Sequence, residues 1–197
     1  MPNQFSNLGI SAPILKAITE LKFVVPTEIQ QKTIPLLLSN TNDIVGLAKT
    51  GTGKTAAFGL PLLQLIDTKI AAVQAVILVP TRELGHQIFS NLEAFAKYLP
   101  EVSIAATCGG IPIKPQIERL TSPTHIVVAT PGRLIDLIQR KAINLKETQF
   151  LVLDEADEMV TILKEGLNEV SLNVPAGLYF VKITSLTNTY SSKLIVR

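Results

Sequence analysis

The sequence contains a single cysteine, Cys108, and only two histidines, so it offers neither an intramolecular disulfide nor a cluster with zinc-ligand spacing. This residue usage fits a reducing, cytoplasmic compartment. No apolar run approaches the roughly 20 residues that a membrane-spanning helix needs, and the amino end lacks a basic segment followed by an apolar stretch. We therefore expect neither a secretory signal nor a membrane span.

An excess of charge of one sign is also missing, because 18 basic side chains face 16 acidic ones. A polycationic surface for nucleic acid is thereby excluded, and any RNA binding must be local. Aromatic residues make up 5% of the chain and tryptophan is absent, while 47% of residues are apolar. A chain of 197 residues with this composition has about the length of one domain and favours a parallel sheet covered by helices.

Short apolar segments alternate with amphipathic stretches along the first 153 residues. The expected strands cover residues 43–48, 75–79, 102–106, 125–129 and 150–153. The expected helices cover residues 11–21, a stretch from near Thr27, and residues 54–66, 82–98, 114–120 and 132–140. This alternation predicts an α/β fold with a doubly wound, mostly parallel sheet and ligands at the carboxyl ends of its strands.

A glycine-rich segment, Ala-Lys-Thr-Gly-Thr-Gly-Lys-Thr at 48–55, joins the first expected strand to the following helix. Its glycines let backbone N–H groups turn toward a polyphosphate, and the helix start adds partial positive charge. The Lys54 ammonium suits the β- and γ-phosphates, and the Thr55 hydroxyl suits Mg²⁺. In isolation the segment is equally consistent with a flexible loop. The expected ATP contacts are Lys49, Thr50, Gly51, Thr52, Gly53, Lys54 and Thr55.

A second motif, Asp-Glu-Ala-Asp at 154–157, directly follows the apolar run at 150–153. Asp154 at the end of a buried strand can hold Mg²⁺ through water, and Glu155 can orient and deprotonate the attacking water. An acidic, solvated helix start is the alternative interpretation. Because a phosphate loop precedes this motif, we predict ATP hydrolysis, with Lys54, Asp154 and Glu155 as the catalytic residues and Thr55 and Asp154 as the metal ligands.

With these two motifs in order, residues 1 to about 165 resemble the first RecA-like domain of a DEAD-box ATP-dependent RNA helicase. Residues 23–30 resemble the adenine-reading Q motif, which together with the upstream aromatic spans 5–30. The resemblance implies that Gln30 selects ATP over GTP through its side-chain amide, and that Lys22 replaces a usual glycine, a change we expect the turn to tolerate. The implied adenine-side residues are Phe5, Phe23, Thr27 and Gln30.

Three further segments resemble the motifs with which this family holds the RNA backbone. They are Pro80-Thr-Arg-Glu-Leu84, Gly109-Gly110 and Thr130-Pro-Gly-Arg133. Each puts small residues, a hydroxyl or a guanidinium at a strand end or helix start, where phosphates are held without sequence readout. An ordinary turn and surface ion pairs are the alternatives for each motif alone. The implied RNA contacts are Pro80, Thr81, Arg82, Gly109, Gly110, Thr130, Pro131, Gly132 and Arg133.

The resemblance also implies parts that this sequence does not contain: a strand ending in Ser-Ala-Thr after the acidic tetrad, and a second RecA-like domain. We therefore expect a truncated fold that does not unwind duplexes alone and hydrolyses ATP slowly, because loss of an arginine finger lowers turnover by about 10³–10⁵. Residues 178–184 are a candidate to fill the place of the missing strand, although this would bury Lys182.

After about Gly166 the pattern changes to strand-like runs at 170–174, 178–184 and 191–196, with turns at 175–177 and 186–189. Alternation in the middle run predicts a half-exposed antiparallel strand in a β-hairpin-like segment. Residues 172–197 resemble the carboxyl-terminal sorting domain of type IX secreted bacterial proteins. We therefore expect two parts, a RecA-like ATP-binding domain at 1–165 and a β-rich tail at 166–197, with a strand pair packed beside the sheet as the alternative.

Three hypotheses follow from the sequence. The first is a monomeric, cytoplasmic, ATP- and RNA-binding enzyme domain that uses Mg²⁺. The second is a binding module that retains affinity for nucleotide or RNA without turnover. The third is an inactive chimera with a junction near Gly166.

Overall fold

A computed structural model describes residues 3–39, 44, 46, 51–155, 181–184 and 189–192 of the chain. The helices are the 3-10 helix η1 (Gln4–Leu8), α1 (Ala12–Glu20), α2 (Glu28–Ser39), α3 (Lys54–Leu65), α4 (Arg82–Phe95), α5 (Lys114–Leu120) and α6 (Pro131–Gln139). The strands are β1 (Ala75–Leu78), β2 (Ile104–Thr107), β3 (Ile126–Ala129), β4 (Phe150–Leu153), β5 (Val181–Thr184) and β6 (Thr189–Ser192).

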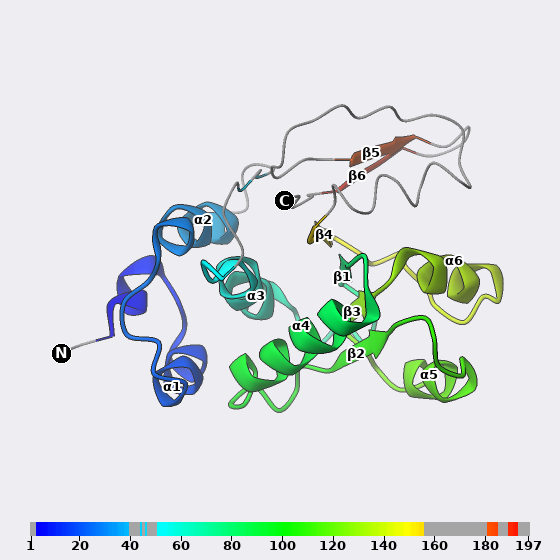
Figure 1. The fold of residues 1–197 in the computed structure, drawn as a ribbon, viewed down its shortest axis with the longest axis horizontal. Helices are drawn as coiled ribbons and strands as arrows, with labels where there is room; N and C mark the ends of the chain where they lie inside the picture. The colour runs from blue at the N-terminus through cyan, green and yellow to red at the C-terminus, as the bar shows by residue number, and fades with distance from the viewer. Residues whose placement is uncertain are drawn as a thin grey trace.

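The first four strands form one parallel sheet in the order β2-β3-β1-β4. β1 lies between β3 and β4, with Val76 opposite both Val127 and Leu151. Helices follow the strands and lie on both sides of the sheet, with α3 and α4 on one side and α5 and α6 on the other (Figure 1). The predicted doubly wound, parallel α/β fold is therefore confirmed for the described residues.

Successive strand residues point to opposite faces, and both faces are buried. Ile77, Val128 and Val152 belong to the large cluster that α3 and α4 cover. Val76 and Val127 belong to a smaller cluster with α6. A strand that is buried on both faces consists of consecutive apolar residues and lacks the alternation of a half-exposed strand. These strands could therefore be predicted from short, continuous apolar runs.

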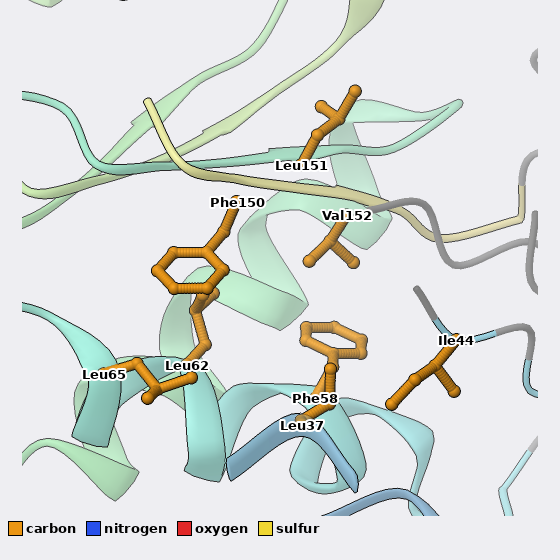
Figure 2. A pocket seen from close by; sticks show the side chains of 8 residues that line it. All are labelled: Leu37, Ile44, Phe58, Leu62, Leu65, Phe150, Leu151 and Val152. Atoms are coloured by element: carbon orange, nitrogen blue, oxygen red, sulfur yellow. The ribbon is translucent and has the colours of Figure 1, made fainter. Parts of the chain in front are cut away.

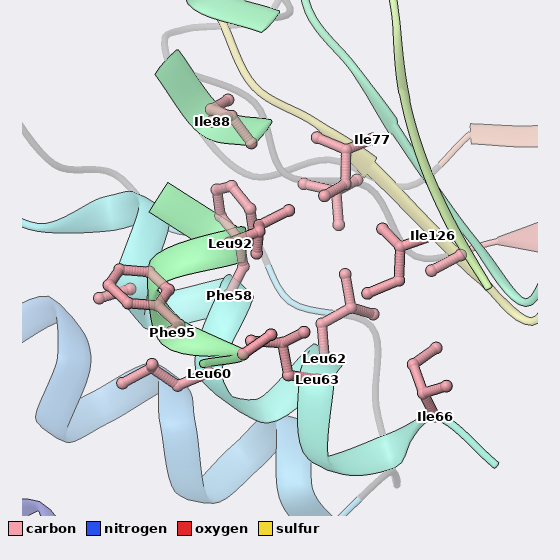
Figure 3. Close-up of a cluster of buried hydrophobic side chains, with 14 of the residues drawn as sticks. Phe58, Leu60, Leu62, Leu63, Ile66, Ile77, Ile88, Leu92, Phe95 and Ile126 are labelled. Carbon is pink, nitrogen blue, oxygen red and sulfur yellow. The ribbon is translucent and has the colours of Figure 1, made fainter. Parts of the chain in front are cut away.

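The larger core fixes α3 and α4 against the sheet. Figure 3 shows Phe58 and Leu62 of α3, Leu92 of α4 and Ile77 of β1 converging on one apolar interior. Burial of each such side chain contributes about 1.5–3 kcal/mol relative to exposure. The two helices approach closely at Gly59, where a Cβ would lie 2.8 Å from Leu92 Cδ2.

Most element boundaries agree with the sequence prediction to within three residues. Among the helices and the strands of the main sheet, the largest difference is in α4, which ends at Phe95 instead of residue 98. The Leu99 N–H donates to the Ala96 carbonyl (2.7 Å), an i→i−3 bond that breaks the α-helical pattern there. The helix η1 was not predicted. The expected strand at 43–48 lies outside the described residues except for Ile44 and Gly46. Within the described part of the chain, no helix has the length and apolarity needed to cross a membrane.

The tail strands β5 and β6 pair with each other in an antiparallel two-stranded sheet, with Val181 opposite Ser192. This confirms the expected hairpin-like segment. β6 begins at Thr189, two residues before the expected start, and so includes the last residue of the expected turn. The suggestion that residues 178–184 complete the main sheet is wrong for the described part, since β5 pairs with β6 and β4 pairs with β1. The expected strand at 170–174 lies outside the described residues.

Lys22 closes the end of α1 in a left-handed conformation, with a φ of 62°. The Lys22 N–H donates to the Thr19 carbonyl (2.9 Å), and the Phe23 N–H donates to the Ile18 carbonyl (2.9 Å). These two bonds form a Schellman motif, in which glycine is the preferred residue at the left-handed position. The lysine is tolerated, as expected, but the structure shows that its cost is backbone strain.

We predict that Lys22→Gly stabilises the protein by about 0.5–1 kcal/mol, because removal of the Cβ relieves the left-handed penalty while raising the entropy of the unfolded chain. Urea unfolding followed by circular dichroism measures this difference. Lys22→Ala is the matched control, since it removes the charge and keeps the Cβ. A gain of equal size in Lys22→Ala would contradict the backbone explanation.

His125 precedes β3 and is 3% exposed. Its Nδ1 accepts a hydrogen bond from the Ser103 N–H (3.0 Å). Burial disfavours the charged imidazolium and lowers the pKa of His125. The strand predicted at 125–129 included this residue, whereas β3 begins at Ile126 and His125 packs beside its start.

The depressed pKa of His125 makes folding sensitive to acid. The unfolded chain, with a histidine pKa of about 6.5, binds the proton more readily than the folded one. Stability contributed by the neutral ring is therefore present above about pH 6.5 and decreases as pH falls toward the folded-state pKa. We predict that the urea midpoint of His125→Asn, whose Oδ1 can replace the Nδ1 acceptor, falls less between pH 7.5 and 5 than that of the unmodified protein. If the urea midpoints of the two proteins fall equally between pH 7.5 and 5, His125 does not contribute to the acid sensitivity and the prediction is wrong.

Candidate nucleotide and RNA-backbone site

The described part of the phosphate loop leads directly into α3. Gly51 and Gly53 have left-handed φ values of 80° and 84°, which glycine adopts without strain. Lys54 is the first residue of α3 and is 4% exposed, and Thr55 beside it is half-buried. The predicted turn into a helix start is therefore present. Two predicted contacts, Lys49 and Thr50, lie outside the described residues.

A small apolar pocket shows how α3 is aligned with β4. It is lined by Leu37, Ile44, Phe58, Leu62, Leu65, Phe150, Leu151 and Val152 (Figure 2). The last turns of α3 face Phe150, whereas Phe58, one turn after the helix start, faces Val152. Asp154 lies two residues beyond Val152 along the strand direction, a distance of about 6.7 Å. Lys54 lies four residues before Phe58 in α3, a distance of about 6 Å in the same direction. Lys54 and Asp154 thus lie at the same end of the sheet.

Asp154 and Glu155 directly follow β4. The Asp154 N–H donates to the Leu78 carbonyl (3.0 Å), which extends the ladder with β1 by one residue and fixes the backbone there. Asp154 is fully buried and Glu155 is half-buried with a φ of 56°. A left-handed backbone costs a non-glycine residue about 1–2 kcal/mol and is often found at functional sites.

The Q-motif segment contacts the phosphate loop directly. Gln30 is buried, its Nε2 donates to the Gly53 carbonyl (3.0 Å), and its Oε1 accepts from the Thr27 N–H (2.9 Å). The Thr27 hydroxyl donates to the Thr52 carbonyl (2.8 Å). The structure therefore brings Thr27 and Gln30 to the phosphate loop, and their contact with adenine stays a prediction.

The two aromatic residues implied on the adenine side lie in or beside the core. Phe5 is 1% exposed and its ring stacks on Phe23 with a centroid separation of 6.4 Å. Phe23 in turn meets Phe95 edge to face at 6.0 Å. Phe5 thus has no open face for a base in this structure. Phe5 is placed so that it supports the turn at Phe23. A direct contact between Phe5 and adenine stays a prediction.

The Pro80–Leu84 segment connects β1 to α4. The Thr81 hydroxyl caps α4 by accepting from the Leu84 N–H (3.2 Å). Arg82 is exposed, and its Nη2 donates to Glu83 Oε1 (3.3 Å). The pKa of Glu83 is lowered by a hydrogen bond from its own backbone N–H and by Arg82.

The Gly109–Gly110 turn meets the other two RNA-backbone motifs. The Gly109 N–H donates to the Thr130 hydroxyl (3.0 Å). A Cβ on Gly110, whose φ is 79°, would lie 3.3 Å from Arg82 Nη1, so the guanidinium lies against this turn. Gly132 in the first turn of α6 is exposed and borders open space. Pro131, by contrast, is buried. The three motifs therefore form one surface.

Arg133 is half-buried, and its guanidinium is turned toward α5 and the loop that follows β2. Its Nη1 donates to Gln116 Oε1 (2.5 Å) and its Nη2 donates to the Ile111 carbonyl (2.8 Å). Gln116 Nε2 donates to the Cys108 carbonyl (3.0 Å). The sequence prediction missed Gln116, because the only signal was one polar residue on the inner face of a seven-residue helix.

Cys108 and His86, which lie near this surface in the sequence, have a packing and a surface position respectively. Cys108 is 1% exposed, and burial raises the pKa of its thiol. A Cβ on Gly85 would lie 2.5 Å from Cys108 Sγ, so α4 packs directly on this thiol. His86 is exposed. Among the described residues, no three His, Cys, Asp or Glu side chains gather into a metal cage.

A sequence model described as DEAD/DEAH box helicase matches residues 27–194 of the chain. The chain belongs to the DEAD/DEAH box helicase family. The parallel α/β fold described above is thus that of a DEAD-box domain of RecA-like fold.

Curated DEAD-box relatives include the DEAD-box ATP-dependent RNA helicase CshA of Streptococcus pneumoniae, 46% identical over 173 residues, or 87% of this chain and 33% of the relative. The ATP-dependent RNA helicase DeaD of Escherichia coli is 42% identical over 174 residues, or 88% of this chain and 28% of the relative. The chain spans about a third of the length of these relatives.

Solved DEAD-box structures share the fold. A DEAD box protein from Methanococcus jannaschii has a TM-score of 0.75 at 44% identity, over 80% of this chain and 43% of that one. Saccharomyces cerevisiae Dbp5, described as bound to RNA and ADP BeF3, has a TM-score of 0.72 at 26% identity, over 98% of this chain and 45% of that one.

Proposed function

We propose that this chain is the ATP- and RNA-binding domain of a DEAD-box RNA helicase and hydrolyses ATP with Mg²⁺. The observation that carries the proposal is the alignment of α3 with β4, which supports a site for the triphosphate between Lys54 and Asp154. The names of the relatives, which are ATP-dependent RNA helicases, favour the same activity.

The donor set at this end of the sheet fits Mg²⁺. Magnesium takes oxygen ligands and is usually held by one or two protein groups together with phosphate oxygens and water. Asp154, a fully buried carboxylate at a strand end, and the Thr55 hydroxyl would supply the protein oxygens. The ion would neutralise charge on the β- and γ-phosphates.

The protein's own residues divide the remaining work. Lys54, at the start of α3, binds the phosphate oxygens, and the backbone N–H groups around Gly51 and Gly53 orient the triphosphate. Glu155 accepts a proton from the attacking water at its carboxylate, which contributes about 10²–10⁴ to the rate in comparable enzymes. The base is read by Gln30, whose amide has a second N–H and a second acceptor lone pair besides those that bond Gly53 and Thr27.

The RNA side of the proposal rests on the surface formed by Arg82, the Gly109–Gly110 turn and the start of α6. A guanidinium, the backbone of a glycine turn and a helix start hold phosphates without reading bases, so binding needs little net charge and little sequence preference. Dbp5, a structural relative described as bound to RNA, favours this assignment. Arg82 and Gly110 lie in contact, which supports a shared phosphate.

We also propose that the ATP-binding domain covers residues 1–165 and that residues 166–197 form a separate β-rich tail. The pairing of β5 with β6 apart from the main sheet supports this division. The resemblance of the tail to a type IX sorting domain, and the alternatives of a binding-only module or a chimera, stay hypotheses. Monomeric state and cytoplasmic location are likewise proposals.

We predict that Lys54→Ala weakens binding of a fluorescent ATP analogue at least about tenfold, because charge-assisted phosphate contacts are each worth about 1.5–3 kcal/mol. Fluorescence titration with Mg²⁺ present measures the dissociation constant. Lys146→Ala, which removes an exposed lysine ahead of the amino end of β4, is the matched control. Equal affinity of Lys54→Ala and the unmodified protein would end the ATP-binding proposal.

We predict that Glu155→Gln lowers RNA-stimulated phosphate release by about 10²–10⁴ and changes ATP affinity by less than about threefold, since the amide cannot accept the proton. A phosphate-sensor assay with oligouridylate measures release, and Glu147→Gln, an exposed glutamate ahead of β4, is the control. If ATP binds and release is undetectable even in the unmodified chain, the binding-only module is the better hypothesis.

A further inference from the structure

The Cys108–Ile111 loop contains the Gly109–Gly110 turn. The side chains of Gln116 and Arg133 donate hydrogen bonds to its two ends. Gln116 Nε2 donates to the Cys108 carbonyl at one end of the loop (3.0 Å), and Arg133 Nη2 donates to the Ile111 carbonyl at the other (2.8 Å). The two holding groups are themselves joined, because Arg133 Nη1 donates to Gln116 Oε1 (2.5 Å). Both ends of the loop are thus tied to one bonded pair.

We propose that Gln116 is a positioning residue for RNA binding: its amide, fixed by Arg133, holds the Cys108–Ile111 loop in the conformation that presents Gly110 and Arg82 to a phosphate. The RNA part of this inference rests on the proposed function, whereas the loop-holding part does not. Gln116 itself is 6% exposed and lies beneath the loop, so it acts through the backbone that it holds.

The loop needs such support because of its own composition. Two consecutive glycines lose more conformational entropy on ordering than other residues, and Gly110 has a left-handed φ of 79°. A loop that is already ordered binds a ligand without that cost, which is the general advantage of a preorganised site. The Thr130 hydroxyl, which accepts from the Gly109 N–H, gives a third point of attachment.

Loss of the amide leaves polar groups without their partners. In Gln116→Met the Cys108 carbonyl and one Arg133 donor lose their described bonds inside the protein, which favours conformations in which the loop opens to water. The single cysteine of the chain, Cys108, lies at the start of this loop and is 1% exposed. Its reactivity with a thiol reagent therefore reports loop opening at one defined place.

The first experiment measures the rate at which Ellman's reagent labels Cys108 in the intact 197-residue chain. We expect Gln116→Met to raise the rate at least about tenfold with a weak dependence on urea, because a local opening exposes little surface. The matched control is Gln74→Met. Gln74 is a second buried glutamine that bonds Asp67 and Ile70 just ahead of β1, away from the loop.

The outcomes of labelling are decisive. The holding role is supported if Cys108 is labelled fast and with little urea dependence in Gln116→Met, and if this fast labelling is not seen in Gln74→Met. An unchanged rate, or an increase that has the steep urea dependence of global unfolding, overturns it, since Gln116 would then be a packing residue only.

Gln116→Glu separates the two bonds of the amide. The glutamate keeps an acceptor for Arg133 and loses the donor to the Cys108 carbonyl. If holding the loop start is what matters, Gln116→Glu labels about as fast as Gln116→Met. Labelling at the unmodified rate would assign the holding to Arg133 and contradict the role of the Gln116 donor.

The second experiment measures affinity for fluorescein-labelled oligouridylate by anisotropy, beside affinity for the ATP analogue. We expect Gln116→Met to weaken RNA binding about tenfold and to change ATP affinity by less than about twofold. An opened loop with unchanged RNA affinity would overturn the RNA role and leave the holding role standing. If the unmodified chain binds no RNA, the proposed function itself fails, and the labelling result still decides what Gln116 does.

Discussion

The parallel, in-register pairing of the main sheet is the constraint on which the rest of the structure depends. Leu78 lies opposite both Ala129 and Leu153, and Ala129 lies opposite Thr107. The four strands therefore end in one row. The candidate site residues come directly after these strand ends. They are polar or charged side chains and glycines: Thr81 and Arg82, Cys108 to Gly110, Thr130, and Asp154 with Glu155. A slip of one residue in a single strand would remove its motif from the common edge.

Burial of both sheet faces explains why the helix starts lie at this same edge. Each helix must run back antiparallel to its strand to cover the sheet, so α4 and α6 begin within a few residues of the strand ends. Unpaired N–H groups and the positive end of the helix dipole are then directed at the edge. This edge therefore carries positive partial charge from local dipoles, although the net charge of the chain is only +2.

The sequence predicted the elements better than it predicted the direction of side chains. Strands such as Phe150–Leu153 are short apolar runs whose burial on both faces leaves a clear pattern. Nothing comparable marks Gln116, a polar residue whose partners, Cys108 and Arg133, are distant in sequence. The RNA-backbone motif likewise gave the position of Arg133 at the start of α6 but not the turn of its guanidinium into the protein.

The same limit applies to Lys22, where a comparison of residue types identified an unusual position and only the backbone showed why glycine suits it. Its φ of 62° belongs to a Schellman motif that turns the chain from α1 toward Phe23. Phe23 and the buried Phe5 then fix the start of the Q-motif segment against Phe95. A strained residue is stable here because tertiary packing on both sides of the turn determines the path of the chain.

Gly53 shows that the base side and the phosphate side of the candidate nucleotide site form one unit. Its φ of 84° is required for the turn, and a Cβ would lie 2.3 Å from Gln30 Nε2. Glycine is thus needed both for the left-handed backbone of this turn and for the close approach of the Gln30 amide. The Gln30 amide carries a second N–H beside the one that it donates to the Gly53 carbonyl, so it can bond the loop and a further acceptor at the same time. A single side chain therefore joins the Q-motif segment to the conformation of the loop at Gly53.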